Sequence, residues 1–112
     1  MFAQTPEPPY YAVIFSTLLT EDYDGYVETI DEMIALAEQQ PGFLGIERAR
    51  NGKEQGGLGI SVSYWASLDA INVWRNNADH MAVKGKGRKK WYRAYRLRIT
   101  KVEKDGTWEV GG

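Results

Sequence analysis

A chain of 112 residues has room for one hydrophobic core and none for a second independent one. With 43% hydrophobic residues, 26% charged residues and a formal net charge of -1, the composition excludes an intrinsically disordered chain. The chain contains no cysteine, which excludes disulfides, iron–sulfur clusters and thiol nucleophiles.

The sequence shows no segment that would direct the chain to a membrane or out of the cell. No apolar run approaches the ~20 residues needed to span a bilayer. The N-terminus also lacks a basic region followed by a long apolar one. We therefore expect a cytoplasmic protein with no membrane partner.

Charge is unevenly distributed along the chain. Eleven of the 15 acidic residues precede residue 70, whereas ten of the 14 Lys and Arg residues lie between Lys84 and Lys104. A basic stretch of this kind can attract an anion, RNA or DNA. Because the overall charge is close to zero, we favour a solvated face that is balanced by acidic residues elsewhere or on a partner subunit.

The first nine residues contain three prolines and predict an extended N-terminal arm. Residues 10–19 (YYAVIFSTLL) are β-branched and aromatic and barely alternate, which is typical of a strand buried on both faces. A helix follows, with N-cap candidates in residues 20–24 and an end at Pro41-Gly42. Its apolar positions recur at helical spacing, and they are Val27, Ile30, Met33, Ile34 and Ala37.

Two further strands are predicted at residues 43–50 (FLGIERAR) and 58–65 (LGISVSYW). The intervening residues 51–57 begin with Asn51-Gly52 and fit the turn of a hairpin with a rather long loop. The two strands are therefore expected to pair with each other.

Ser67 is placed to cap a second helix, with Asp69 in its first turn. The apolar positions of this helix are Ala70, Ile71, Trp74, Ala78 and Met81. Gly85 and Gly87 are expected to break or bend it. Residues 92–102 then alternate apolar with basic or polar side chains, which predicts a final strand before a C-terminal tail.

The resulting order, β-α-β-β-α-β, is the split pattern of ferredoxin-like folds. We therefore expect an α+β domain over residues 10–104, between an arm at 1–9 and a tail at 105–112. Its antiparallel sheet would carry both helices on one face and leave the other open to water. Because the first strand is so apolar, we expect a homodimer in which the two sheets face each other, a dimeric α+β barrel.

Two segments, ISVSYWASLDAINVWRNNADH and KKWYRAYRLRITKVEK, carry a family resemblance. Trp65 closes a strand, residues 67–71 open a helix, and Trp74 and His80 follow. Residues 41–47 (PGFLGIE) also fit the entry into the second strand. On these features nearly the whole domain resembles the antibiotic biosynthesis monooxygenase family of dimeric α+β barrel proteins.

The resemblance implies an oxygenase that acts on a small aromatic or phenolic substrate of polyketide or quinol type, using O₂ and no flavin, metal or other cofactor. The family also includes haem-degrading enzymes, which have an Asn in the first strand and a haem-ligating His late in the second helix. Here YYAVIFSTLL contains no Asn, His80 falls about one helical turn too early, and Lys84 lies near the ligand position. Haem degradation is therefore disfavoured.

His80 is the only imidazole and the natural candidate for proton transfer near neutral pH. As a base it would deprotonate a phenol, and the resulting electron-rich anion can reduce O₂. The resemblance implies that Trp74 lines the pocket, and Trp65 is the candidate for a second wall. The favoured alternative for Trp65 is packing in the hydrophobic core, because buried aromatic side chains contribute a large core area. The candidate donors to the substrate anion are Tyr64, Tyr95 and Arg93. The alternative is that His80 only hydrogen-bonds a backbone carbonyl or Asp79.

Other classes fit less well. One histidine and no cysteine give no usual set of metal ligands. RNA-recognition domains share the β-α-β-β-α-β order but need aromatic residues at set places on the third strand, where this chain has GLGISVSYW, so no nucleic acid is expected. A non-catalytic dimeric ligand-binding or stress-response protein would share the pocket and leave His80 without a function.

Overall fold

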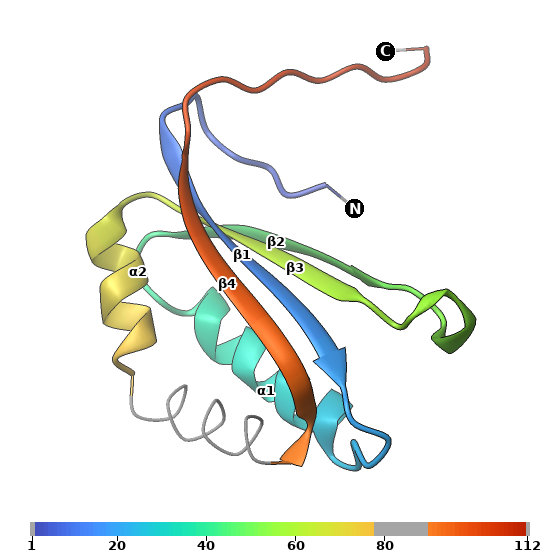
Figure 1. Ribbon diagram of the computed structural model, residues 1–112. Helices are drawn as coiled ribbons and strands as arrows, with labels where there is room; N and C mark the ends of the chain where they lie inside the picture. Colours follow the sequence, from blue (N-terminus) through green and yellow to red (C-terminus); the bar gives the residue numbers. More distant parts are fainter. Residues whose placement is uncertain (1, 78–89, 112) are drawn as a thin grey trace.

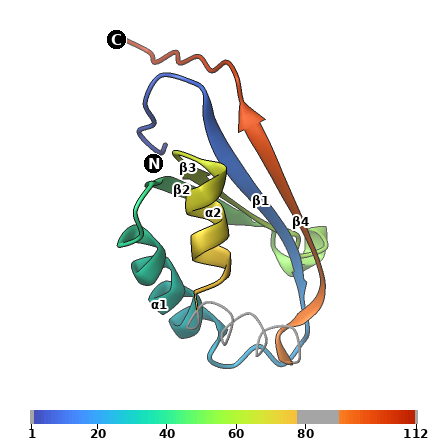
Figure 2. The ribbon, with the colours of Figure 1, turned by 90° about the vertical axis from the view of Figure 1, so that its left-hand side faces the viewer.

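The computed structural model describes residues 2–77 and 90–111. They form an antiparallel sheet with two helices on one face (Figures 1 and 2). The strands are β1 (Tyr10–Leu19), β2 (Phe43–Arg50), β3 (Gly59–Trp65) and β4 (Tyr92–Val102), the helices are α1 (Tyr26–Glu38) and α2 (Leu68–Arg75), and a 3-10 turn covers Lys53–Gln55. The four strands lie in the order β2-β3-β1-β4.

This architecture confirms the prediction of a ferredoxin-like α+β domain. The apolar strand β1 is central, between β3 and the edge strand β4, as its composition indicated. The bounds of β1, β2 and β4 agree with those predicted, and β3 starts at Gly59, one residue later than expected. The structure contains a single copy of the chain, so the dimeric barrel stays a prediction.

The hydrophobic core lies between the sheet and the helices. In β1 the odd-numbered side chains face the helices and the even-numbered ones face away, because successive strand residues point to opposite faces. Tyr11 pairs with Trp65 of β3, which is fully buried and clusters with the equally buried Ile71 of α2. Ala37 and Trp74 complete this buried cluster. It holds both helices on the sheet at the end where β1 starts.

The start of α1 differs from the prediction. No side chain of residues 20–24 caps the helix, because its N-cap is Gly25 at φ 81°, in the left-handed region that favours glycine. The buried indole of Trp91 supports this turn. Its Nε1 donates to the carbonyl oxygen of Asp24 at 2.9 Å, and its ring stands edge-on to Tyr26 with centroids 5.7 Å apart. A tertiary contact thus replaces the expected local cap.

The core-facing stripe of α1 begins at Tyr26 and continues through Ile30, Met33 and Ala37. The prediction that Val27 belongs to this stripe was wrong, since its side chain is 58% exposed. The physical reason is the position of Tyr26. Because that residue faces the sheet, the next one points about 100° away around the helix.

The start of α2 agrees with the prediction. Ser67 Oγ accepts a hydrogen bond from the backbone N–H of Ala70 at 3.1 Å. The turn after α1 packs against the same residue, because a Cβ on Gly42 would lie 2.6 Å from the Ala70 Cβ. Four predicted positions of this region lie outside the described residues, namely Ala78, Met81, Gly85 and Gly87.

No helix covers the sheet face opposite α1 and α2, which is called the open face below. Tyr10 and Ala12 at the start of β1 are nevertheless buried on it. Ile14 and Val62, which are paired across β1 and β3, are half-buried on it. The N-terminal arm and the C-terminal tail extend on this side, away from the helices (Figure 1). The arm is tied down by Ala3, whose N–H donates to Glu47 Oε2 at 2.9 Å.

The described part of the tail forms no strand, so it does not extend the sheet. The start of the tail is held by Tyr10, whose hydroxyl donates to Asp105 Oδ2 at 2.7 Å. Beyond this point Trp108 is 85% exposed. The arm, the tail and the nearby open face surround a hollow of about 640 Å³.

Candidate active site

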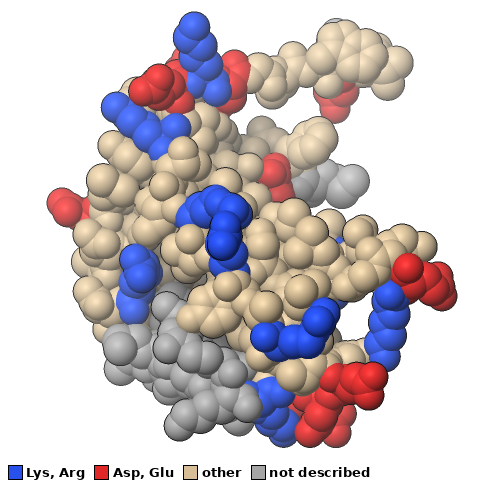
Figure 3. Space-filling view, viewed as in Figure 1, with Lys and Arg blue, Asp and Glu red and all other residues tan. Residues whose placement is uncertain are grey.

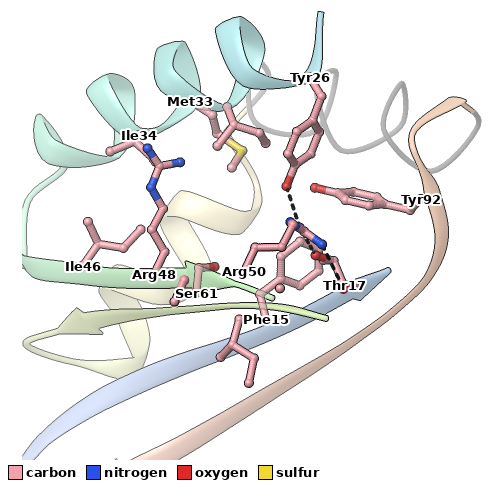
Figure 4. A pocket seen from close by; sticks show the side chains of 14 residues that line it. Phe15, Thr17, Tyr26, Met33, Ile34, Ile46, Arg48, Arg50, Ser61 and Tyr92 are labelled. Carbon is pink, nitrogen blue, oxygen red and sulfur yellow. Dashed lines mark hydrogen bonds between the residues drawn. The ribbon is translucent and has the colours of Figure 1, made fainter. Parts of the chain in front are cut away.

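A cavity of about 320 Å³ lies between α1 and the sheet. Its walls are mainly apolar, with Phe15 on the sheet side and Met33 and Ile34 on the helix side (Figure 4). A smaller hollow of about 90 Å³ shares these residues and reaches the two core tryptophans. The volume of the larger cavity and its mainly apolar lining are typical of small-molecule sites.

The inner hollow is aromatic. Trp65 and Trp74 line it and stack on each other, with ring centroids 6.2 Å apart and planes inclined by 24°. Phe43 stands edge-on to Trp65 at 5.3 Å. The Trp65 Nε1 donates to Ser63 Oγ at 2.9 Å, which satisfies the buried indole. The structure therefore brings together the two tryptophans that the sequence singled out as pocket walls.

The outer end of the cavity is polar. The Arg50 guanidinium lies there, at the end of β2, and donates from Nη2 to the buried Thr17 Oγ1 at 2.6 Å. The same nitrogen lies 3.4 Å from the Tyr26 hydroxyl (Figure 4). Its other terminal nitrogen, Nη1, donates to the carbonyl oxygen of Gly57 at 2.8 Å. A cation is thus held at the rim of a mainly apolar cavity.

Tyr92 faces Tyr26 at this rim, with ring centroids 5.9 Å apart. Burial raises the pKa of Tyr92 far above its usual range, and the adjacent Tyr26 raises it further, whereas Arg50 acts in the opposite direction. The Tyr92 phenol is therefore neutral at physiological pH and is available as a hydrogen-bond donor.

Two of the predicted donors lie beside the cavity rather than in it. Tyr95 packs behind the wall, with its ring 5.4 Å from Phe15 and 5.9 Å from Tyr92. Arg93 is exposed, next to the irregularity in the β1–β4 ladder at Leu18. Neither residue lines either hollow. Their predicted roles toward a substrate receive no support from this placement.

Tyr64 lies on the open face and lines neither of the two hollows between the sheet and the helices. Its neighbour Trp65 faces the helices, and adjacent strand residues point to opposite faces. The Tyr64 hydroxyl donates to Glu47 Oε1 at 2.8 Å. Burial and this carboxylate raise the pKa of Tyr64 to about 12. Its ring stands edge-on to that of Tyr10, 5.9 Å away. Tyr64 thus contacts both Glu47, which holds the arm, and Tyr10, which holds the tail; these three residues are called the open-face cluster.

His80, the predicted base, lies outside the described residues. The described groups that line the two hollows include tyrosines and arginines but no side chain that exchanges a proton near neutral pH. The catalytic role of His80 therefore stays a prediction.

Sequence reasoning missed the polar rim of the cavity. In β2 the side chains of Ile46, Arg48 and Arg50 face the helices, so two arginines stand on the covered face of the sheet. A bulge at Leu44 causes this, because the ladder shifts register between Phe43 and Gly45. The alternating charged residues of FLGIERAR were the available signal for this rim. They do not show which side of β2 faces the helices.

Within the described ranges, no three of the His, Asp and Glu side chains lie together in a group that could hold a metal ion. No described helix is both long and apolar enough to cross a membrane. The described Lys and Arg residues are separated by other side chains on the face shown in Figure 3, rather than gathered in one block.

The family model for antibiotic biosynthesis monooxygenases matches residues 9–86. A relative in Bacillus subtilis (strain 168), which bears the name "Uncharacterized protein YqjZ", is 54% identical over 102 residues, covering 91% of this chain and 87% of the relative.

Solved structures share the fold at low sequence identity. SnoaB from Streptomyces nogalater, described as a cofactor-independent oxygenase, superposes with a TM-score of 0.71 at 10% identity and covers 94% of this chain and 100% of its own. Rv0793 from Mycobacterium tuberculosis gives a TM-score of 0.74 at 14% identity, with coverage of 88% and 99%. Since the family model spans most of the domain, this chain belongs to the antibiotic biosynthesis monooxygenase family.

Proposed function

We propose that the protein is a cofactor-independent monooxygenase that oxidises a small aromatic or phenolic compound in the cavity between α1 and the sheet. The observation that carries this proposal is the cavity with polar groups at its rim, together with the adjoining smaller hollow, which the stacked Trp65 and Trp74 line. Aromatic walls favour a flat ring system. Family membership and the oxygenase SnoaB among the structural neighbours support the same reaction class.

The chemistry balances without an added reductant. Removal of a proton from a phenol or an activated CH₂ group gives an electron-rich anion that can reduce O₂. For a CH₂ group flanked by aromatic rings, the overall change is R₂CH₂ + O₂ → R₂C=O + H₂O. The substrate supplies all four electrons, one oxygen atom enters the product and the other leaves as water. We assign the removal of the proton to His80, the only imidazole of the chain.

We also propose that the functional unit is a homodimer that forms through the open face. The paired residues Ile14 and Val62 leave apolar surface on this face in a single chain. The arm and the tail project on the same side (Figure 1) and present apolar side chains, with Phe2 82% exposed and Trp108 85% exposed. A second copy would cover both surfaces at once.

A non-catalytic ligand-binding protein is the second candidate. It is favoured by the lack, among the described residues that line the cavity, of any group that exchanges protons near neutral pH. Oxygen uptake separates the two candidates. The assay uses the full chain, a panel of anthrones, naphthols and hydroquinones, and the variant His80→Ala. The oxygenase proposal expects uptake with at least one substrate and a loss of about a hundredfold in kcat in the variant. Binding without uptake on the whole panel would favour the ligand-binding protein.

A further inference from the structure

Two arginines on the same face of β2 have different electrostatic surroundings. Arg48 forms an ion pair with Asp31 of α1, at 3.2 Å. Among the described residues, Arg50, two residues further on, donates to neutral oxygens, which belong to Thr17, Gly57 and Tyr26. Within residues 2–77 and 90–111, no carboxylate pairs with Arg50. Its positive charge at the cavity rim is therefore not balanced by the described part of the chain.

Residues of the neighbouring strands fix the position of the Arg50 guanidinium. The residue opposite it in the β2–β3 ladder is the buried Gly59, and a Cβ on that glycine would collide with the guanidinium. Thr17, which is 4% exposed, holds Nη2 from one side, and the Tyr26 ring lies 5.9 Å from the guanidinium carbon. A cation held in this way loses little conformational freedom when it binds an anion.

The contacts of Arg50 also show where an anion would bind. Three of its hydrogen bonds, 2.6 to 3.3 Å long, are to Thr17 of β1 and to Gly57 in the loop between β2 and β3. The fourth, to the Tyr26 hydroxyl, is 3.4 Å long and exceeds the usual range. An anionic oxygen that displaced this hydroxyl would gain a charge-assisted bond from Arg50 and bonds from the hydroxyls of Tyr26 and Tyr92.

We infer that Arg50, together with Tyr26 and Tyr92, binds an anionic oxygen group of an aromatic ligand whose rings lie in the apolar cavity. The inference rests on the proposed function in so far as the cavity must hold an aromatic ligand. It adds that this ligand is an acid, such as a carboxylate or an ionised phenol, rather than a neutral ring system. The guanidinium and the two hydroxyls select the charge, while Phe15 and Met33 contact the rings.

The test compares two fluorescent probes of similar size, anilinonaphthalenesulfonate, which is an anion, and phenylnaphthylamine, which is neutral. Each is titrated into the full chain and three variants. Arg50→Gln removes the charge, and Gly59→Ala keeps the charge but moves the guanidinium. Arg48→Gln is the matched control, because it removes the arginine that is already paired with Asp31. Circular dichroism checks that each variant is folded.

The inference expects Arg50→Gln and Gly59→Ala to weaken binding of the anionic probe by about tenfold or more, while the affinity for the neutral probe changes less than about threefold. Arg48→Gln should change the affinity for either probe by less than about threefold. An equal effect of Arg50→Gln and Arg48→Gln on the anionic probe, or no effect of either, would overturn the inference.

A fourth variant, Met33→Trp, separates this failure from a failure of the proposed function. Met33 lines both hollows, so a larger side chain there fills the cavity. If Met33→Trp abolishes binding of the neutral probe but Arg50→Gln leaves binding of the anionic probe unchanged, the cavity binds aromatic compounds and the anion site is wrong. If Met33→Trp affects neither probe, both the anion site and the aromatic cavity are wrong.

Discussion

The guanidinium of Arg50 lies over Gly59, the residue opposite it in the β2–β3 ladder, in space that a Cβ atom would fill. A methyl group at this position meets the end of a flexible side chain rather than the backbone. We expect Gly59→Ala to change the free energy of unfolding by less than about 1 kcal/mol, because the arginine moves aside. Urea denaturation measures this change. A loss of more than about 3 kcal/mol would show that the guanidinium cannot move.

Trp91 joins the start of α1 to the start of β4. Its indole is buried and donates to the Asp24 carbonyl oxygen. Trp91→Phe should cost about 1 kcal/mol through the lost hydrogen bond, and Trp91→Ala about 3 to 5 kcal/mol through the cavity it leaves. Trp108→Ala, at an exposed site of the tail, should change the stability of the monomer by no more than about 0.5 kcal/mol. Equal effects at the two tryptophans, measured by urea denaturation, would contradict this account.

Alkaline pH should reduce the contribution that Tyr64, hydrogen-bonded to Glu47 on the open face, makes to the stability of the fold. The pKa of Tyr64 is raised to about 12 by burial and by Glu47, whereas an unfolded tyrosine titrates near 10. Below pH 10 the phenol is neutral in both states and its contribution to stability is fully present. Between pH 10 and about 12 the unfolded chain loses this proton first, so the contribution falls as the pH rises.

The variant Tyr64→Phe should therefore show a shallower loss of stability than the wild type over this pH range. Tyr23→Phe, at an exposed tyrosine, serves as the control and should follow the wild-type curve. Tyrosinate absorbance during the titration gives a second measurement, in which one late-titrating tyrosine is missing from Tyr64→Phe alone. Identical curves for the two variants would show that Tyr64 does not contribute.

The proposed dimer can be tested at Val62, which lies on the open face between β1 and β2. Val62→Lys would place a charge in the interface twice, once for each subunit, and should weaken association by about a hundredfold or more. Val73→Lys, on the 60% exposed Val73 of α2, should leave association unchanged. Light scattering at micromolar concentration gives the mass of each variant. A wild-type monomer, or a Val62→Lys dimer, would contradict the proposed assembly.

Local sequence signals predicted most of the fold. The alternation in residues 92–102 and the Ser67 cap both depend on neighbours in the chain, and the structure agrees with them. The start of α1 was not predictable in this way, because the residue that supports it, Trp91, lies far along the sequence. Hydrophobic spacing alone could not separate Tyr26 from Val27, since the two are adjacent and both can face a core.

The site was predictable only in part. Trp65 and Trp74 were identified through a family resemblance, and they do lie together at the inner hollow. The polar rim was missed because the bulge at Leu44 decides that Arg50 faces the helices. Without the bulge, the opposite set of β2 side chains would face them. A single inserted residue in a ladder leaves no clear mark in one sequence.

The central claim is that oxidation takes place in the cavity between α1 and the sheet. The most direct measurement is oxygen uptake with an anthrone by the wild type, by Met33→Trp, which fills the cavity, and by Val73→Trp, which adds the same side chain on the exposed face of α2. We predict uptake by the wild type and Val73→Trp, and a loss of about tenfold or more in a folded Met33→Trp. Unchanged uptake in Met33→Trp, or none in the wild type, would contradict the account.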